Sequence, residues 1–315
     1  MKVDLSIIIV NHNTVRLLQQ ALQSVYDTVG GLNVEVFVID NASSDGSVEM
    51  VRSQFPQVKL LVNSVGLGFA RAANRGLAEG KGDYFLVAHP DVKFLPGTIQ
   101  EMRDFLAAHP QVGVVGGNLI YPDGSFNRCA IKRSSVRQEL VEFSYITFRS
   151  PIKRLPVLRA WFDKEQDSYH WDHQAVAESE LIWNACMMFK REVLEQVGSF
   201  HEEFFIWFAD TDWCYRVRNA GWRACYLPQA KLIHYEKQST GLLDSQAVRY
   251  KIRPALVQSA LNKDRYILLK RHYRPPFLWF KKSLDLVTLW LTVLKLALLR
   301  IFAPRRYRST LDLTR

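Results

Sequence analysis

The chain of 315 residues has only four cysteines, which lie far apart and form no Cys-x-x-Cys pair. This spacing argues against a cysteine zinc site and a disulfide framework, so a reducing, cytoplasmic environment fits best. The first ten residues, MKVDLSIIIV, lack a long hydrophobic segment and a small-residue cleavage site. We therefore expect a first β-strand there and not a signal peptide.

A complete dinucleotide-binding fingerprint is also missing. The stretch GLGFAR has Gly66 and Gly68, but Arg71 stands where a third glycine belongs, and the stretch follows the third predicted strand instead of the first. These two departures exclude a typical dinucleotide-binding motif.

A surplus of positive charge is missing from most of the chain, although the net charge of the whole chain is +10. Residues 1–248 carry 25 Lys or Arg and 28 Asp or Glu, whereas residues 249–315 carry 16 and 3. In this last segment the basic residues alternate with long aliphatic runs and not with exposed stacking residues. We therefore predict no nucleic-acid binding.

The first 120 residues alternate short apolar runs with amphipathic stretches, which is typical of βα units in a doubly wound, mostly parallel sheet. An irregular segment, a loop or an insertion, is expected near residues 125–178. The predicted strands are residues 5–10, 34–39, 59–62, 84–88 and 112–117, and the predicted helices are residues 15–27, 46–55, 69–80 and 97–109.

Polar residues follow the predicted strands, where open α/β sheets bind their ligands. Asp40 ends the second strand and could accept a hydrogen bond from a ribose hydroxyl or a base, although its surroundings also fit a turn and a helix cap. Arg71 and Asn74 open a helix after a glycine-rich turn. They could bind a diphosphate, or Arg71 could be an ordinary solvated side chain.

A second polar group suggests a metal ion. His89 and Asp91 follow the fourth strand, and His234 ends a later one. Carboxylates and phosphates together suit Mg²⁺ or Mn²⁺. The alternatives are a simple turn at Asp91 and a structural histidine at position 234.

The stretch WFADTDWCYR places two carboxylates in apolar surroundings, where unpaired charges are costly. Asp210 and Asp212 also fit the acidic first turn of a helix that ends before Gly221. Side chains at positions i and i+2 of a helix point about 200° apart, so Asp210 and Asp212 are not expected to act on one proton.

Taken together, these motifs resemble family 2 of the inverting, nucleotide-sugar-dependent glycosyltransferases, which have the GT-A fold, and in particular enzymes of bacterial surface polysaccharides such as rhamnosyltransferases. The similarity runs through residues 4–240. It is carried by SIIIVNHNT, VIDNASSDGSVEMV, NSVGLGFARAANRGL, YFLVAHPDV, VGVVGGNLIYPDGS, LIHY and the long stretch from WNACMMF to ADTDWCYRVRNAGWRACYLP.

The resemblance implies roles for the donor side of the site. Asp40, with His12, would hold the nucleoside, and Arg71 and Asn74 would lie near it. Asp91 and His234 would bind a divalent cation, Mg²⁺ or Mn²⁺. His89, where the family's motif usually has Asn or Asp, is a third candidate ligand.

It also implies a catalytic and acceptor side. Asp210 would be the general base, in a motif whose leading Glu is replaced here by Ala209. Trp183, Trp207 and Asp212 are the residues expected to contact the acceptor.

We expect two regions: a catalytic GT-A domain over residues 1–245, and a basic, amphipathic helical extension over residues 246–315. The extension would lie on an anionic membrane surface; a transmembrane helix and a helix packed against the protein or a partner subunit are the alternatives.

The predicted function is transfer of a sugar from a nucleoside-diphosphate sugar, of the dTDP-rhamnose or UDP-hexose type, to a lipid-linked or growing surface glycan at the inner face of the cell membrane. The alternative is a non-catalytic, membrane-associated binding protein built on a decayed transferase fold. The oligomeric state stays open, including a homo-oligomer.

Overall fold

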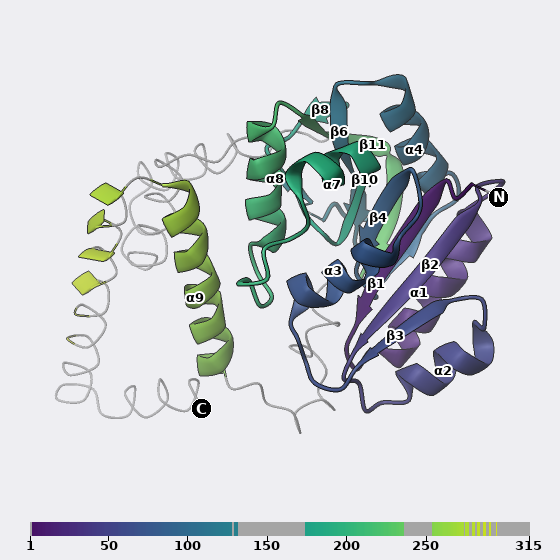
Figure 1. The fold of residues 1–315 in the computed structure, drawn as a ribbon, viewed down its shortest axis with the longest axis horizontal. Coiled ribbons are helices and arrows are strands. Elements are labelled where there is room, and N and C mark those ends of the chain that lie inside the picture. The colour runs from purple at the N-terminus through teal and green to yellow at the C-terminus, as the bar shows by residue number, and fades with distance from the viewer. Residues whose placement is uncertain are drawn as a thin grey trace.

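A computed structural model describes residues 2–127, 129–131, 174–235 and 254–273, with isolated positions between 275 and 294. Most of the predicted irregular segment therefore lies outside the described residues. The architecture is a central sheet with helices on both faces, and a further helix beside the main body (Figure 1). This confirms the predicted α/β class.

The main sheet has nine strands in the order β3-β2-β1-β4-β10-β6-β11-β5, with β8 paired to β11. Pairing is parallel within β3-β2-β1-β4 and between β6 and β11, whereas β10 runs antiparallel to both of its neighbours. The strands are β1 (Leu5–Asn11), β2 (Val34–Asn41), β3 (Lys59–Asn63), β4 (Tyr84–Ala88), β5 (Val92–Phe94), β6 (Val112–Ile120), β8 (Ala177–Glu178), β10 (Cys186–Lys190) and β11 (Arg223–His234), and β7 (Ala130–Ile131) pairs with β9 (Leu181–Ile182) in a small second sheet.

The helices in the first part of the chain agree with the predicted ranges to within two residues. They pack through their apolar faces; α3 approaches the sheet so closely that a Cβ at Gly76 would collide with Ile8 and Ile39. The helices are α1 (Val15–Thr28), α2 (Ser47–Gln54), α3 (Phe69–Glu79), α4 (Thr98–Ala108), α7 (Arg191–Val197), α8 (Ala209–Asn219) and α9 (Pro254–His272).

Strand pairing brings the polar strand ends to one edge of the sheet. Asn11 at the end of β1 is aligned with Asp40 on β2. On the other side of the sheet, His234 at the end of β11 is aligned with Val92, the residue that follows Asp91. Residues far apart in sequence therefore meet where ligands bind in such folds.

Helix α9 lies beside α8 (Figure 1). Leu268 and Leu269 on α9 are buried, so this part of the predicted C-terminal region packs against the residues before it. Among the described residues, no helix has the length and apolar character needed to cross a membrane.

Candidate active site

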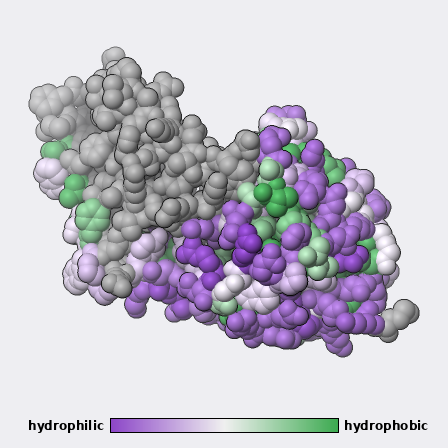
Figure 2. All heavy atoms as spheres, turned by 90° about the horizontal axis from the view of Figure 1, so that it is seen from above, coloured by the Kyte–Doolittle hydropathy of each residue, from purple (hydrophilic) through white to green (hydrophobic). Residues whose placement is uncertain are grey.

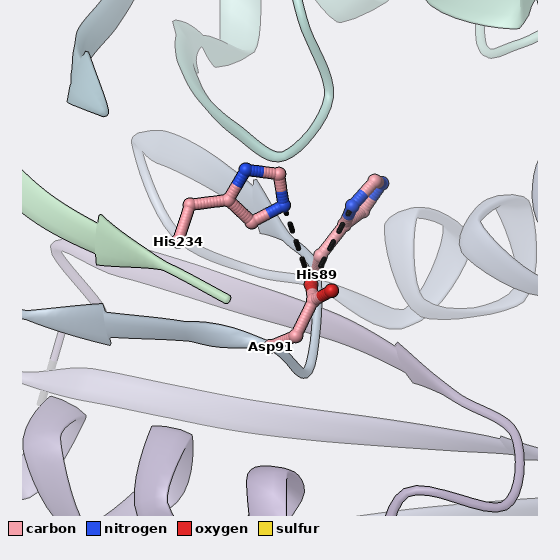
Figure 3. A group of neighbouring side chains, drawn as sticks. All are labelled: His89, Asp91 and His234. Carbon is pink, nitrogen blue, oxygen red and sulfur yellow. Dashed lines mark ion pairs between the residues drawn. The ribbon is translucent and has the colours of Figure 1, made fainter. Parts of the chain in front are cut away.

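His89, Asp91 and His234 form a compact cluster at the edge of the sheet (Figure 3). The Asp91 carboxylate points toward both imidazoles: Oδ1 lies 3.5 Å from Nε2 of His234 and 3.8 Å from Nδ1 of His89. One ligand atom from each residue lies within 4.8 Å of the others. The three side chains that the sequence predicted as metal ligands are thus together.

The chemistry of this cluster fits a divalent cation. Asp91 is only 1% exposed. Burial lowers the pKa of His89, against the opposing effect of the Asp91 charge, which favours a neutral imidazole with a lone pair for a metal. The Asn127 side-chain amide lies 3.2 Å from Nδ1 of His234. This contact helps to orient the ring with Nε2 toward Asp91.

Asp210 lies in the first turn of α8, and this helix begins directly after Phe208, whose φ of 64° is left-handed. Its Oδ1 accepts a hydrogen bond of 2.7 Å from the Thr211 N–H, and its Oδ2 accepts one of 3.3 Å from the Asn184 N–H. Burial raises the pKa of Asp210, although these hydrogen bonds oppose the effect. A carboxylate with a raised pKa accepts a proton more readily, as a general base must.

One short turn connects Asp210 with the cluster of His89, Asp91 and His234. The N–H of Asn184 bonds to Asp210, and the Asn184 side chain hydrogen-bonds to His89. The next carbonyl, from Ala185, accepts from the His89 N–H at 3.1 Å. Asn184 follows the predicted acceptor residue Trp183 in a motif of the family resemblance, but no sequence pattern indicated this role for it.

Asp212 has a different environment from Asp210. It is fully buried, and its Oδ1 accepts from His272 on α9 at 2.9 Å. Its Oδ2 lies 2.8 Å from Nδ1 of His201 and accepts from Arg216 at 3.0 Å. Burial alone would raise the pKa of Asp212, but the His272 bond and the Arg216 charge lower it. The two acids therefore do not face one proton, and an acceptor contact for Asp212 stays a prediction.

The predicted nucleoside residues lie at the ends of β1 and β2. Asp40 is buried, with its Oδ2 accepting from the Asn11 side chain and its Oδ1 from the Ser43 N–H, both at 2.9 Å. His12 is exposed, with its Nδ1 2.9 Å from the Asn41 carbonyl oxygen. Asp40 therefore shapes the loop around the predicted nucleoside position, and direct contact stays a prediction.

The other predicted residues lie around α3 and α8. Asn74 donates to the Phe200 carbonyl at 2.8 Å and accepts from its N–H at 3.0 Å, so this amide ties α3 to the segment before α8. Arg71 is exposed and lies 3.6 Å from Glu202. Trp183 and Trp207 are partly buried, and both precede Asp210 in the sequence. Their contacts with donor or acceptor stay predictions.

Comparison with known proteins gives a consistent picture. The family model described as Glycosyl transferase family 2 matches residues 6–198. An N-acetylglucosaminyl-diphospho-decaprenol L-rhamnosyltransferase of Mycobacterium tuberculosis is 30% identical over 264 residues, which are 78% of this chain and 79% of that protein.

Two further similarities are less extensive. The dTDP-rhamnosyl transferase RfbF of Shigella flexneri is 36% identical over 61 residues, or 19% of this chain and 21% of that protein. Among solved structures, the mannosyltransferase PcManGT of Pyrobaculum calidifontis, in complex with GDP-Man and Mn²⁺, matches with a TM-score of 0.50 and 18% identity, covering 100% of this chain and 84% of that one. At this identity the structural likeness bears on the fold alone.

Proposed function

The chain belongs to glycosyl transferase family 2 and is a glycosyltransferase with the GT-A fold, and from this premise we propose that it transfers a rhamnosyl group from dTDP-rhamnose to a lipid-linked glycan. The observation that carries the proposal is the turn at Asn184 and Ala185, which joins the Asp210 carboxylate to the His89, Asp91 and His234 cluster. A base and a charge-stabilising group side by side are what sugar transfer requires.

The choice of donor and acceptor rests on the relatives. The Mycobacterium tuberculosis protein is named for transferring L-rhamnose to N-acetylglucosaminyl-diphospho-decaprenol, and RfbF is named for dTDP-rhamnose. We therefore expect dTDP-rhamnose as donor, with UDP-hexoses as the alternative, and a polyprenyl-diphosphate-linked sugar as acceptor.

The proposed reaction is a single displacement with inversion. Asp210 takes the proton from the acceptor hydroxyl while the hydroxyl oxygen attacks the anomeric carbon. The bond from that carbon to the diphosphate oxygen breaks, and the nucleoside diphosphate leaves from the opposite face. The raised pKa of Asp210, which burial causes, suits this proton transfer.

His89, Asp91 and His234 would hold a divalent cation. Such an ion, when bound, would neutralise charge on the leaving diphosphate. Two imidazoles and one carboxylate favour Mn²⁺ over Mg²⁺, because Mg²⁺ prefers oxygen ligands. Asn127 would help to keep the His234 ring turned toward Asp91.

We further propose that the protein acts at the inner face of the cell membrane, held there by its C-terminal region. Exposed hydrophobic side chains support this proposal: Trp279 is 71% and Trp290 63% exposed. Figure 1 shows isolated positions of the C-terminal region at its left margin, and Figure 2 shows hydrophobic residues on the surface at the same side. Basic residues such as Lys282 accompany them and suit anionic lipid.

A thermal-shift screen of nucleotide sugars, with and without Mn²⁺, tests donor and metal together, because a ligand that binds the native state raises its unfolding temperature. We expect the largest shift with dTDP-rhamnose plus Mn²⁺. The variants Asp91→Asn and His234→Gln should lose the Mn²⁺-dependent part of the shift. A shift from dTDP-rhamnose that is equal with and without Mn²⁺ would contradict the metal assignment.

The same samples separate an enzyme from the alternative, a non-catalytic binding protein. An enzyme releases nucleoside diphosphate when donor and acceptor are both present, whereas a binding protein shows the thermal shift alone. Ala209, which stands where family members have Glu, is the feature that favours the alternative.

A further inference from the structure

Helix α9 carries a fully buried carboxylate that holds the segment before the proposed base. Asp264 is 0% exposed. Its Oδ2 accepts hydrogen bonds of 3.1 Å from the backbone N–H groups of Phe205, Ile206 and Trp207. Three successive N–H groups converging on one ionised oxygen are charge-assisted bonds, which are stronger than neutral ones.

The held segment, residues 204–208, connects the two sides of the active site. On the donor side, the Phe205 carbonyl accepts a 2.6 Å hydrogen bond from the Phe69 N–H at the start of α3. A Cβ at Gly68 would collide with this carbonyl, so the two backbones are in close contact. On the other side the segment leads through Phe208 into α8 and Asp210.

Hydrophobic burial contributes little at the centre of this segment, because Phe205 is 46% and Ile206 36% exposed. Phe208 adopts a left-handed backbone conformation, which costs about 1–3 kcal/mol in a residue other than glycine. Such a conformation persists only where its surroundings impose it. From α9, the bonds to Asp264 hold the three residues that directly precede Phe208.

We propose that Asp264 is a positioning residue of the active site: by binding three backbone N–H groups before α8, it fixes the place of Asp210 relative to the donor. The proposal rests on the proposed function of Asp210 as base. Helix α9 would then contribute a residue to the active site, in addition to leading into the C-terminal region.

The test compares three variants of the full-length protein. Asp264→Ala removes the acceptor, and Asp264→Asn keeps one neutral acceptor oxygen. Arg271→Ala is the matched control, because Arg271 also joins α9 to this part of the chain, through a 2.7 Å ion pair with Glu203, but on the exposed surface where ion pairs contribute little.

The first readout is transfer kinetics. We expect kcat to fall by about 10²-fold in Asp264→Ala, as for other small displacements of catalytic groups, with the KM for donor nearly unchanged. Asp264→Asn should recover part of the loss, and Arg271→Ala should match the wild type. Equal kcat values in Asp264→Asn and the wild type would overturn the proposal.

The second readout needs no activity. Chymotrypsin cleaves after aromatic residues, and residues 204–208 contain four of them. Within this segment, cleavage of the folded Asp264→Asn variant should be faster than in the wild type and in Arg271→Ala. Unchanged cleavage would show that Asp264 does not hold the segment. Because this readout is independent of turnover, an inactive wild type would contradict the proposed function and leave this result interpretable.

Discussion

At the residue scale, two aspartates in one helical turn have opposite electrostatic environments. Burial raises the pKa of Asp210, whose hydrogen-bond donors carry no charge. Asp212 is also buried, but contacts with His272 and Arg216 lower its pKa. Asp210 is therefore suited to accept a proton, whereas Asp212 is suited to remain charged and hold its partners.

The raised pKa of Asp210 predicts the acid side of the pH profile. A base acts only when ionised, so kcat should be full at high pH and fall as the pH drops through the Asp210 pKa. The apparent pKa of this limb should lie above the ordinary value of about 3.9 for aspartate. The measurement is kcat from pH 4 to 8 at saturating donor and acceptor. A limb at or below the ordinary value would contradict the environment described for Asp210.

Asp212 predicts a pH-dependent contribution to stability. A lowered pKa stabilises the fold above the unfolded-state pKa of about 3.9, and this stabilisation is lost as the pH falls through the folded-state value. Asp212→Asn should lower the free energy of unfolding by about 2 kcal/mol at neutral pH, because charged hydrogen bonds are lost. Urea unfolding should show this difference at pH 5 and a smaller one at pH 3. A difference that does not change with pH would speak against the ionic role.

Some of the predicted site residues lie together in the structure, and other residues of the site could not be found in the sequence for a physical reason. Asp91 and His234 could be foreseen as neighbours because both follow strand patterns, and strand ends meet at one edge of a sheet. Three other residues act through contacts that are distant in sequence. Asn184 contacts His89 and Asp210, and Asn127 contacts His234. Asp264 binds residues 205–207. Such contacts leave no periodic signal in the chain.

At the element scale, amphipathic periodicity was sufficient for the helices but not for the direction of every strand. The run CMMF forms β10, which lies antiparallel between β4 and β6. An apolar run gives no indication of direction. The predicted extension over residues 246–315 includes α9, whose residues 264, 268 and 269 are buried. The basic charge of the sequence marks the C-terminal region as distinct, but only the tertiary structure shows how α9 packs.

The C-terminal positions beyond α9 yield a prediction at this scale. Trp279 and Trp290 are exposed, and burying such side chains in a lipid interface contributes about 1.5–3 kcal/mol each. The double variant Trp279→Glu, Trp290→Glu should bind vesicles with anionic lipid at least about 10²-fold more weakly, as measured by sedimentation. Val62→Glu changes an exposed hydrophobic residue on β3 and is the matched control. Equal vesicle binding by all three proteins would rule out this membrane contact.

At the scale of the whole molecule, the site is assembled from segments spread between residues 89 and 234 of the chain. The end of β4 supplies His89 and Asp91, the turn before β10 supplies Asn184, α8 supplies Asp210 and β11 supplies His234. The basic surplus of residues 249–315 lies apart from this assembly in sequence. Helix α9 packs beside α8 and leads into the last residues of the chain, which would bring the active site to a lipid-linked acceptor.

Single-turnover transfer by Asp210→Asn tests the central claim most directly. Enzyme in excess over dTDP-rhamnose, with Mn²⁺ and a polyprenyl-diphosphate-linked acceptor, is sampled for product over time, and donor binding is measured in parallel. We predict a rate about 10²–10⁴-fold below the wild type, the usual contribution of a general base, with donor affinity retained. A variant that binds donor and transfers sugar at the wild-type rate would contradict the account.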